Sequence, residues 1–249
     1  MVFLVPMLIT NNQQVNNRLP LYSKPNNIVF LCSSNGGNLK FFYNFLKNFK
    51  LLNQFRIICM ADRDCGAMKF ANENMIESIR FVHPKNDSSN LIKELSLVNP
   101  SLIITTFHKK LDSNFVKIYG EISYNLHYSL LPKHKGLIGR STVEESFRTD
   151  ILIGTTLHRI NNEIDSGPII FQSSFSKNSV VNEQKALDMN FKLGCLQLTN
   201  LIFKEFSSKF RSFSLKEISE IDNVLITSFP ILLSLDSNYY SEIFYEIKI

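Results

Sequence analysis

From residue 28 onward, short apolar runs alternate with segments of helical periodicity, and this alternation constrains the fold more than any other feature of the chain. The predicted strands are 28–31, 55–60, 79–82 and 102–105, and the predicted helices are 38–49, 67–74 and 91–98. Strands that alternate with helices form a parallel sheet with right-handed crossovers. The sequence therefore predicts an α/β fold in which ligands lie beyond the carboxyl ends of the strands.

The remainder of the chain is less regular. We predict an extended segment at 123–127, strands at 154–160 and 169–175, a long helix at 186–206, and a second helical segment after Phe213 before an aromatic tail at 239–249. We expect one domain over 28–210, an N-terminal extension over 1–27, and a C-terminal extension over 211–249 that packs on the same domain. The N-terminal extension is alternatively an edge strand or a partner-binding arm.

Charge and composition exclude several classes of protein. The chain is 44% hydrophobic and 20% charged, a balance typical of globular proteins. Its net charge of +5 fits an anionic substrate or cofactor, but no dense basic patch predicts a nucleic-acid partner. The apolar segment 1–10 is shorter than the roughly 20 residues of a membrane helix and lacks the basic start of a signal peptide, so we expect no membrane partner.

The four cysteines, Cys32, Cys59, Cys65 and Cys195, are scattered along the chain. No pair has the Cys-x-x-Cys spacing of a zinc site, and no histidine cluster stands near them. Scattered, reduced thiols are typical of the cytosol. We therefore expect a cytoplasmic protein with no metal site.

A glycine-rich loop, Ser33-Ser34-Asn35-Gly36-Gly37-Asn38, follows the first predicted strand. Backbone N–H groups at such a turn, with the dipole of the helix that follows, attract an anion. The loop has neither a Walker ending nor the Gly-x-Gly-x-x-Gly pattern. We take Asn35, Gly36, Gly37 and Asn38 as candidate substrate-binding residues; the alternative is a simple tight turn.

Polar side chains alternate along Tyr124-Asn125-Leu126-His127-Tyr128-Ser129-Leu130-Leu131-Pro132. Because side chains two residues apart share a face of a strand, Asn125, His127 and Ser129 point to one side. An amide and an imidazolium both donate hydrogen bonds to a developing oxyanion. The pattern therefore indicates catalysis, although a lone histidine is more often structural.

A carboxylate and another histidine lie farther along the chain. Asp165 stands in the turn Ile164-Asp165-Ser166-Gly167-Pro168 between two predicted strands, so the fold can return it to His127. A carboxylate beside an imidazole orients the ring, holds its charge or accepts a proton through water. His158, in Gly154-Thr155-Thr156-Leu157-His158, either borders the same pocket or is a satisfied strand residue, and we favour the second interpretation slightly.

In this order, Asn-Leu-His-Tyr-Ser-Leu-Leu-Pro-Lys, Gly-Thr-Thr-Leu-His and Asp-Ser-Gly-Pro-Ile-Ile resemble the folate-dependent formyltransferase family, over residues 28–206. The resemblance implies a Rossmann-like, mostly parallel twisted sheet with helices on both faces. It places Asn125, His127 and Asp165 at the positions of the family's catalytic trio. It implies a substrate-phosphate site at the glycine loop. It also implies a cleft for 10-formyltetrahydrofolate near the Asp165 loop and Phe107, His108, Lys109, Lys110 and Leu111.

The chain departs from the family pattern on the acceptor side. Tyr128 stands where many relatives have Pro or Ala, and Gly37 stands where Ser is usual. The long helix lacks an acidic residue at 193–198, and the segment 137–153 is longer than in the glycinamide ribonucleotide enzymes. These departures concern the identity of the acceptor more than formyl transfer itself.

We therefore expect a formyltransferase that moves a formyl group from 10-formyltetrahydrofolate to the amine of a small phosphorylated or sugar substrate. In the expected mechanism, Asn125 and a protonated His127 stabilise the oxyanion, while Asp165 holds His127 and relays the proton of the amine. The alternatives are a formyltetrahydrofolate hydrolase that releases formate and a non-catalytic folate-binding module. The sequence leaves the oligomeric state open.

Overall fold

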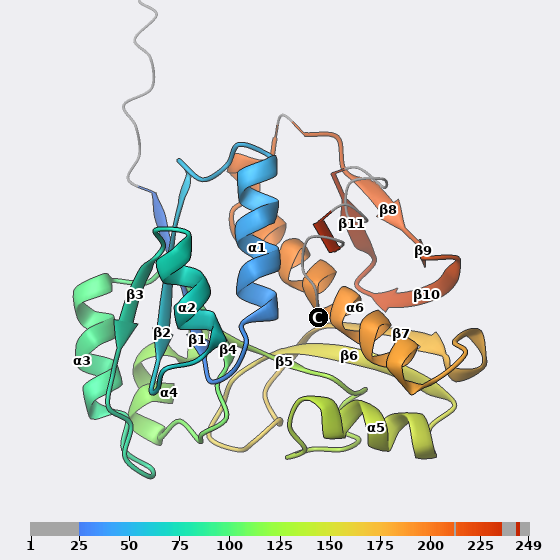
Figure 1. Ribbon diagram of the computed structural model, residues 1–249, viewed down its shortest axis with the longest axis horizontal. Coiled ribbons are helices and arrows are strands. Elements are labelled where there is room, and N and C mark those ends of the chain that lie inside the picture. Colours follow the sequence, from blue (N-terminus) through green and yellow to red (C-terminus); the bar gives the residue numbers. More distant parts are fainter. Residues whose placement is uncertain (1–24, 212, 236–242, 245–249) are drawn as a thin grey trace, which may run out of the picture.

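The computed structural model of the chain describes residues 25–211, 213–235, 243 and 244 (Figure 1). Most of the expected N-terminal extension and of the aromatic tail lies outside the described residues. The strands are β1 (Asn26–Cys32), β2 (Phe55–Ala61), β3 (Glu77–Arg80), β4 (Leu102–Thr106), β5 (Ser123–His127), β6 (Leu152–Arg159), β7 (Ile169–Ser176), β8 (Lys216–Ile218), β9 (Glu220–Ile221), β10 (Val224–Phe229) and β11 (Leu232–Ser234). The helices are α1 (Gly37–Asn48), α2 (Gly66–Glu73), α3 (Ser89–Val98), α4 (Ser113–Tyr119), α5 (Arg140–Thr149) and α6 (Glu183–Glu205).

Within the described ranges, nine strands form one sheet in the order β3-β2-β1-β4-β5-β6-β7-β10-β9, and β8 pairs separately with β11. Strands β3, β2, β1, β4 and β5 run parallel to one another. Strands β6, β7, β10 and β9 extend the sheet, in that order, by antiparallel pairing. Helices α1, α2 and α6 cover one face, and α3 and α4 cover the other (Figure 1). This is the α/β architecture that the alternation of apolar segments predicts.

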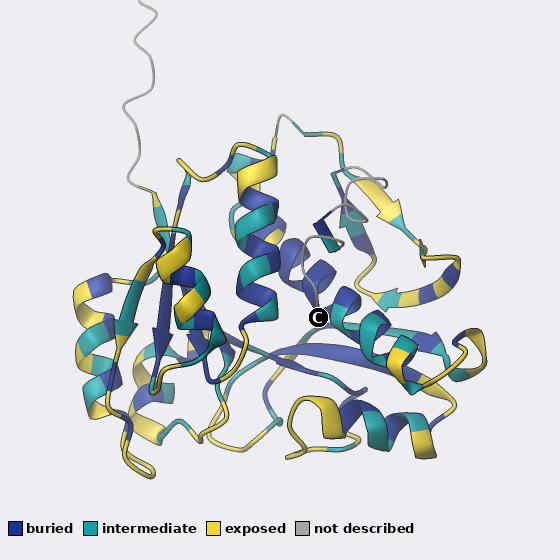
Figure 2. Ribbon diagram, in the orientation of Figure 1, coloured by how far each residue is buried: buried dark blue, intermediate teal, exposed yellow. Residues whose placement is uncertain are grey.

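The apolar run of β1 explains why this strand lies at the centre of the parallel half. Ile28 and Phe30 pack in the core on the side of α1 and α6, whereas Val29 and Leu31 pack on the side of α3 and α4. All four side chains are at most 1% exposed. A parallel strand that helices cover on both faces has no side on which a polar residue reaches water. Figure 2 shows the same burial along the neighbouring central strands, whereas exposed residues lie on the outer sides of the helices, in the loops and on outlying strands such as β3 and β8.

Two helices were not expected from the sequence. Helix α4 begins after Asp112, whose side chain accepts a hydrogen bond from the Phe115 N–H at 2.8 Å and so caps the helix. Helix α5 occupies the segment that the sequence suggested was unusually long. The third strand is also displaced: β3 pairs with β2 from Glu77 to Arg80, two residues earlier than expected at each end, and Val82 is 67% exposed.

The second helical segment expected after Phe213 is wrong. Leu215, Ile218 and Ile221 recur at a helix-like spacing, yet this region forms the short strands β8, β9, β10 and β11. Strands β9 and β10 join through Asp222 and Asn223, which both adopt positive φ angles, 50° and 62°. Two consecutive residues in this conformation make the tight turn that matches the twist of a hairpin. Strand β10 then pairs antiparallel with β7.

The loops at the carboxyl ends of β1, β4 and β5 meet at one edge of the parallel half of the sheet. Ser33, which directly follows β1, accepts a hydrogen bond through its Oγ from the His108 N–H at 3.1 Å. This bond joins the loop after β1 to the loop after β4. The same edge receives the loop between β6 and β7, which carries Asp165. No helix in the part of the chain that the structure describes is long and apolar enough to cross a membrane.

Candidate active site

A cavity of about 400 Å³ opens at this edge of the sheet. Its lining includes every sequence-predicted site residue except Leu111, namely Asn35, Gly36, Gly37, Asn38, Phe107, His108, Lys109, Lys110, Asn125, His127 and Asp165. Leu111 instead lines a smaller cavity of about 110 Å³ that shares Asn125 and Asp165 with the larger one. The two cavities therefore meet at the predicted catalytic residues.

Asn125, His127 and Asp165 lie together at the boundary between the cavities. Asn125 and His127 share one face of β5, and Asp165 comes from the loop between β6 and β7. The Asp165 carboxylate lies 3.3 Å from His127 Nδ1 through Oδ2, and it accepts a hydrogen bond from Asn125 Nδ2 at 3.5 Å through Oδ1. Asp165 has a φ of +51°, which non-glycine residues rarely adopt. Such a conformation is common at functional sites, where the surroundings hold it in place.

His158 lies directly behind this trio. Its Nδ1 donates to the backbone oxygen of Arg159 at 3.0 Å, since that oxygen can only accept. Its Nε2 lies 3.2 Å from Asn125 Nδ2 and 3.5 Å from Asp165 Oδ1. His158 therefore helps to position both the Asn125 amide and the Asp165 carboxylate. Both interpretations offered by the sequence hold, because His158 is a satisfied strand residue and also borders the site.

The loop from residue 132 to 139 closes the other side of the trio. The backbone oxygen of His134 lies 3.1 Å from His127 Nε2, and the Gly136 N–H donates to Asp165 Oδ2 at 2.9 Å. These two residues act through backbone atoms. Sequence reasoning missed them because a backbone contact leaves no mark in the pattern of side chains.

Burial and charge set the protonation of the trio. Burial is the largest influence on His127 and lowers its pKa, although the neighbouring carboxylate of Asp165 opposes the change. Burial alone would raise the pKa of Asp165, but His158, the Gly136 N–H and His127 outweigh it, so the pKa of Asp165 is lowered. Burial favours the neutral ring of His127 at rest, while the protonated His127 of the expected mechanism stays a prediction. Both ring nitrogens face acceptors, so His127 is placed to receive a proton.

The glycine loop approaches its neighbours closely. Gly36 has a φ of +68°, and an added Cβ there would lie 2.6 Å from the Cβ of Ala67. A Cβ on Gly37 would lie 2.8 Å from the ring of Phe191, which α6 contributes to the cavity wall. Glycine at both positions therefore lets the start of α1 sit between α2 and α6.

One residue of this loop has its side chain committed elsewhere. Asn38 is 5% exposed; its Oδ1 accepts a hydrogen bond from the Tyr128 hydroxyl at 3.0 Å, and its Nδ2 donates to Cys195 Sγ at 3.6 Å. Only its backbone remains suited to binding a substrate. Tyr128, which stands where many relatives have Pro or Ala, therefore links the end of β5 to the first turn of α1.

The residues predicted to bind the folate donor also differ in how far their side chains already have partners within the protein. Lys109 Nζ lies 2.6 Å from the Asp62 carboxylate and donates to the His83 backbone oxygen at 3.0 Å. Asp62 is buried, which would raise its pKa, but Arg63 and Lys109 lower the pKa to about 2. The positive charge of Lys109 is thus largely neutralised within the protein. Lys110 and Lys40 also line the cavity.

Comparisons with known proteins agree with this geometry. Residues 26–191 match the family described as Formyl transferase. Phosphoribosylglycinamide formyltransferase of Escherichia coli K12 is 30% identical over 154 residues, which cover 59% of this chain and 71% of the relative. The mitochondrial formyltetrahydrofolate deformylase 2 of Arabidopsis thaliana is 39% identical over 93 residues, but these cover 36% of this chain and only 27% of the relative.

Solved structures show the same fold. Phosphoribosylglycinamide formyltransferase of Coxiella burnetii superimposes with a TM-score of 0.65 at 26% identity and covers 81% of this chain and 93% of its own. The Rossmann-like sheet with helices on both faces is thereby confirmed. The family match spans most of the described residues, including β1, β5 and the Asp165 loop. The chain is therefore a member of the formyl transferase family of enzymes.

Proposed function

We propose that the protein transfers a formyl group from 10-formyltetrahydrofolate to the amine of a small substrate that is phosphorylated or is an amino sugar. The observation that carries this proposal is the meeting of Asn125, His127 and Asp165 at one end of a cavity. An amide donor, a nearly buried imidazole and a carboxylate around one space suit acyl transfer to an amine. A cytoplasmic location is part of the same proposal and stays a prediction.

The residues around the cavity fit the donor. Formyltetrahydrofolate combines a flat ring system with an anionic glutamate. Phe107 and Ile164 supply apolar surface near Asp165, while Lys40 and Lys110 supply positive charge. Asp165 is the sole carboxylate among the described residues that line the larger cavity. An anionic donor therefore meets little repulsion there except at the reacting centre.

Each member of the trio has a distinct part in the mechanism. Asn125 turns the Nδ2 hydrogen that faces Asp165 Oδ1 at 3.5 Å toward the formyl oxygen, and donates to that oxygen as it gains negative charge. His127, neutral at rest, accepts the proton that the attacking amine loses. Asp165 holds the ring at Nδ1 and stabilises its transient positive charge, and it can pass the proton on through water. The leaving nitrogen of the donor then recovers a proton from the same relay.

The acceptor side of the cavity narrows the choice of substrate. The start of α1 presents backbone N–H groups beside Lys40, which suits a phosphate. Phe191 of α6 lines the same cavity, and an aromatic ring there suits the apolar face of a sugar ring. A nucleotide precursor as acceptor would place the enzyme in purine biosynthesis.

The test is a panel of amines incubated with 10-formyltetrahydrofolate, read by the absorbance change as the donor loses its formyl group. The panel contains glycinamide ribonucleotide and phosphorylated and free amino sugars. Deformylation that depends on an amine supports the proposal. Binding of the donor in calorimetry with no turnover for any amine would instead favour a non-catalytic folate-binding module.

A hydrolase is the second candidate because a deformylase is among the similar proteins. Water in place of the amine would release formate from the same trio. Formate release without added amine, at a rate that amines do not increase, would establish this alternative and reject transfer.

A further inference from the structure

The loop from residue 132 to 139, here called the clasp loop, holds both titratable members of the trio through its backbone. The His134 oxygen faces His127 Nε2 at 3.1 Å, and the Gly136 N–H donates to Asp165 Oδ2 at 2.9 Å. His134 and Gly136 both have positive φ angles, 57° and 79°. A histidine rarely adopts this conformation, so the loop needs fixed partners to keep it.

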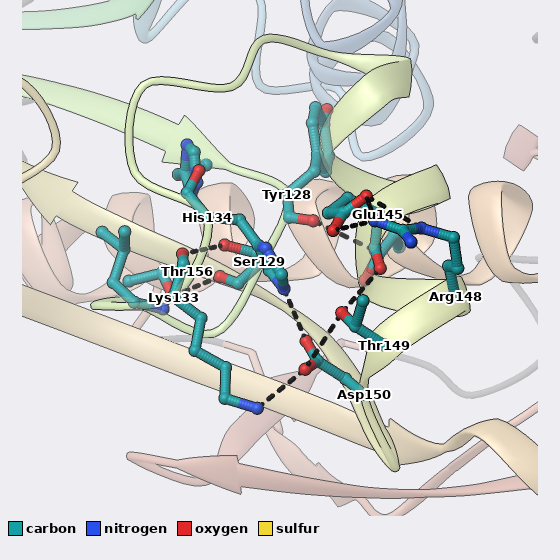
Figure 3. Close-up of polar contacts among 12 residues, drawn as sticks. Tyr128, Ser129, Lys133, His134, Glu145, Arg148, Thr149, Asp150 and Thr156 are labelled. Carbon is teal, nitrogen blue, oxygen red and sulfur yellow. Dashed lines mark hydrogen bonds and ion pairs between the residues drawn. The ribbon is translucent and has the colours of Figure 1, made fainter.

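Asp150, the residue that follows α5, supplies two such partners from outside the loop (Figure 3). Its Oδ1 accepts a hydrogen bond from Lys133 Nζ at 2.7 Å, and its Oδ2 accepts one from His134 Nε2 at 2.7 Å. The Asp150 side chain is 7% exposed and that of His134 is 14% exposed. Short bonds to a shielded carboxylate are stronger than bonds between neutral groups.

The beginning of the clasp loop is held by the sheet instead. Thr156 Oγ1 donates to the Ser129 oxygen at 2.7 Å and accepts from the Leu131 N–H at 3.1 Å. Gln172 Nε2 donates to the Leu131 oxygen at 3.0 Å. Strands β6 and β7 therefore fix the chain up to residue 131. The backbone of Lys133 is held by Ser129 Oγ, which donates to its oxygen at 2.8 Å, and by the Leu130 oxygen, which accepts from its N–H at 3.0 Å. Asp150 adds the contacts that hold the side chains of Lys133 and His134.

We infer that Asp150 is a positioning residue, which keeps His127 and Asp165 aligned by anchoring the clasp loop through Lys133 and His134. Among the described interactions, Asp150 contacts neither His127 nor Asp165, so its effect passes through the backbone of the loop. The inference rests on the proposed function for its effect on turnover. Its effect on the ring of His127 can be measured without any activity.

The first test is Asp150→Asn, which keeps the shape of the side chain and removes its charge. Because the residues predicted to bind the donor, from Phe107 to Lys110, lie outside the clasp loop, we expect kcat to fall about tenfold or more while KM for the donor changes less than about threefold. The second readout is the Cε1–H signal of the His127 ring in NMR spectra. The fixed position of the His134 oxygen beside the ring gives this proton a single environment in the wild type, and we expect its signal to broaden or shift in the variant.

Glu145→Gln is the matched control. Glu145 is another carboxylate of α5, and it pairs with Arg148 at 2.6 Å rather than with the clasp loop (Figure 3). We expect this variant to keep kcat and the His127 signal. A loss of kcat equal to that of Asp150→Asn would mean that removing any negative charge in or next to α5 has this effect, and it would overturn the inference.

His134→Asn covers the case in which Asp150→Asn does not fold. Asn tolerates the positive φ angle and retains the backbone oxygen, but it is too short to reach Asp150. We expect losses in the same direction, and the double variant should lose no more than Asp150→Asn alone, because His134→Asn breaks one of the two contacts that Asp150→Asn weakens. Folded variants that keep kcat within about twofold of the wild type and retain the His127 signal would refute the inference. Failure of the wild type to transfer formyl groups would refute only the proposed function, since the NMR readout still decides this one.

Discussion

Replacing Asp165 by Asn removes one negative charge from the centre of the site and leaves its shape unchanged. The carboxylate has two close partners, His127 Nδ1 at 3.3 Å and the Gly136 N–H at 2.9 Å. Both partners contact the same oxygen, Oδ2, so the single oxygen of Asn can keep them, while its NH2 group replaces Oδ1, which lies 3.5 Å from Asn125 Nδ2 and 3.5 Å from His158 Nε2. The charge that stabilises a protonated His127 and the acceptor of the Asn125 amide are therefore lost together.

The expected loss follows from these contacts. A hydrogen bond to a charged group is worth about 1.5–3 kcal/mol. The attraction between full charges about 4 Å apart is worth roughly 4 kcal/mol at an effective dielectric constant near 20. The two contributions overlap, because the hydrogen bond already includes part of the charge. At about 1.4 kcal/mol for each tenfold change in rate, we expect kcat to fall about 10²–10⁴-fold.

The assay measures donor deformylation with the best amine, with thermal unfolding as the check on folding. Asp222→Asn is a matched control, because Asp222 has nearly the same backbone conformation, with φ +50°, and its carboxylate pairs with Lys185 and Lys192 away from the cavity. That variant should keep full turnover. A folded Asp165→Asn enzyme within about tenfold of wild-type kcat would refute the assignment of Asp165.

Three further outcomes can be checked. His127→Ala should lose at least about 10²-fold in kcat with its fold intact, and near-normal turnover would remove His127 from the mechanism. Burial lowers the pKa of His127 below the value of about 6.5 for an unfolded chain. The contribution of the neutral His127 ring to stability is therefore present above about pH 6.5 and is lost as the pH falls through the folded pKa. An NMR titration of the folded ring with a midpoint at or above about 6.5 would contradict this. Gly167→Ala should destabilise the fold by about 1–3 kcal/mol in denaturant unfolding and lower kcat, because a Cβ there would lie 1.7 Å from the Arg159 oxygen and push the Asp165 loop away; unchanged stability would show that the loop adapts freely.

The parts of the fold and site that the sequence predicted are those with a strong side-chain pattern. The apolar run of β1 and the alternation along Asn125 and His127 indicate a buried strand and a polar strand end. Asp165 was singled out by its turn between two predicted strands, and the family resemblance then assigned it to the catalytic trio. The partners of Lys109 and Asn38 could not be predicted, because Asp62 and Tyr128 come into contact with them only in the folded chain.

Two kinds of feature escaped prediction for physical reasons. The clasp loop acts on the trio through a backbone oxygen and a backbone N–H, which every residue except proline has. The strands after Phe213 have apolar residues at a helix-like spacing, and the tight turn at Asp222 and Asn223 decided against a helix. Local turn geometry and tertiary pairing thus overrode the periodicity.

The pairing of β10 with β7 matters for anyone who prepares shorter fragments. The family match ends at residue 191, so a fragment trimmed there would lose much of α6 as well as β10. A fragment trimmed at residue 210 would keep α6 but would leave the hydrogen-bonding edge of β7 bare from Gln172 to Phe175. Bare strand edges recruit other chains and promote aggregation. Recombinant material intended for crystals or kinetics should therefore run past Phe229, whatever the sequence match implies.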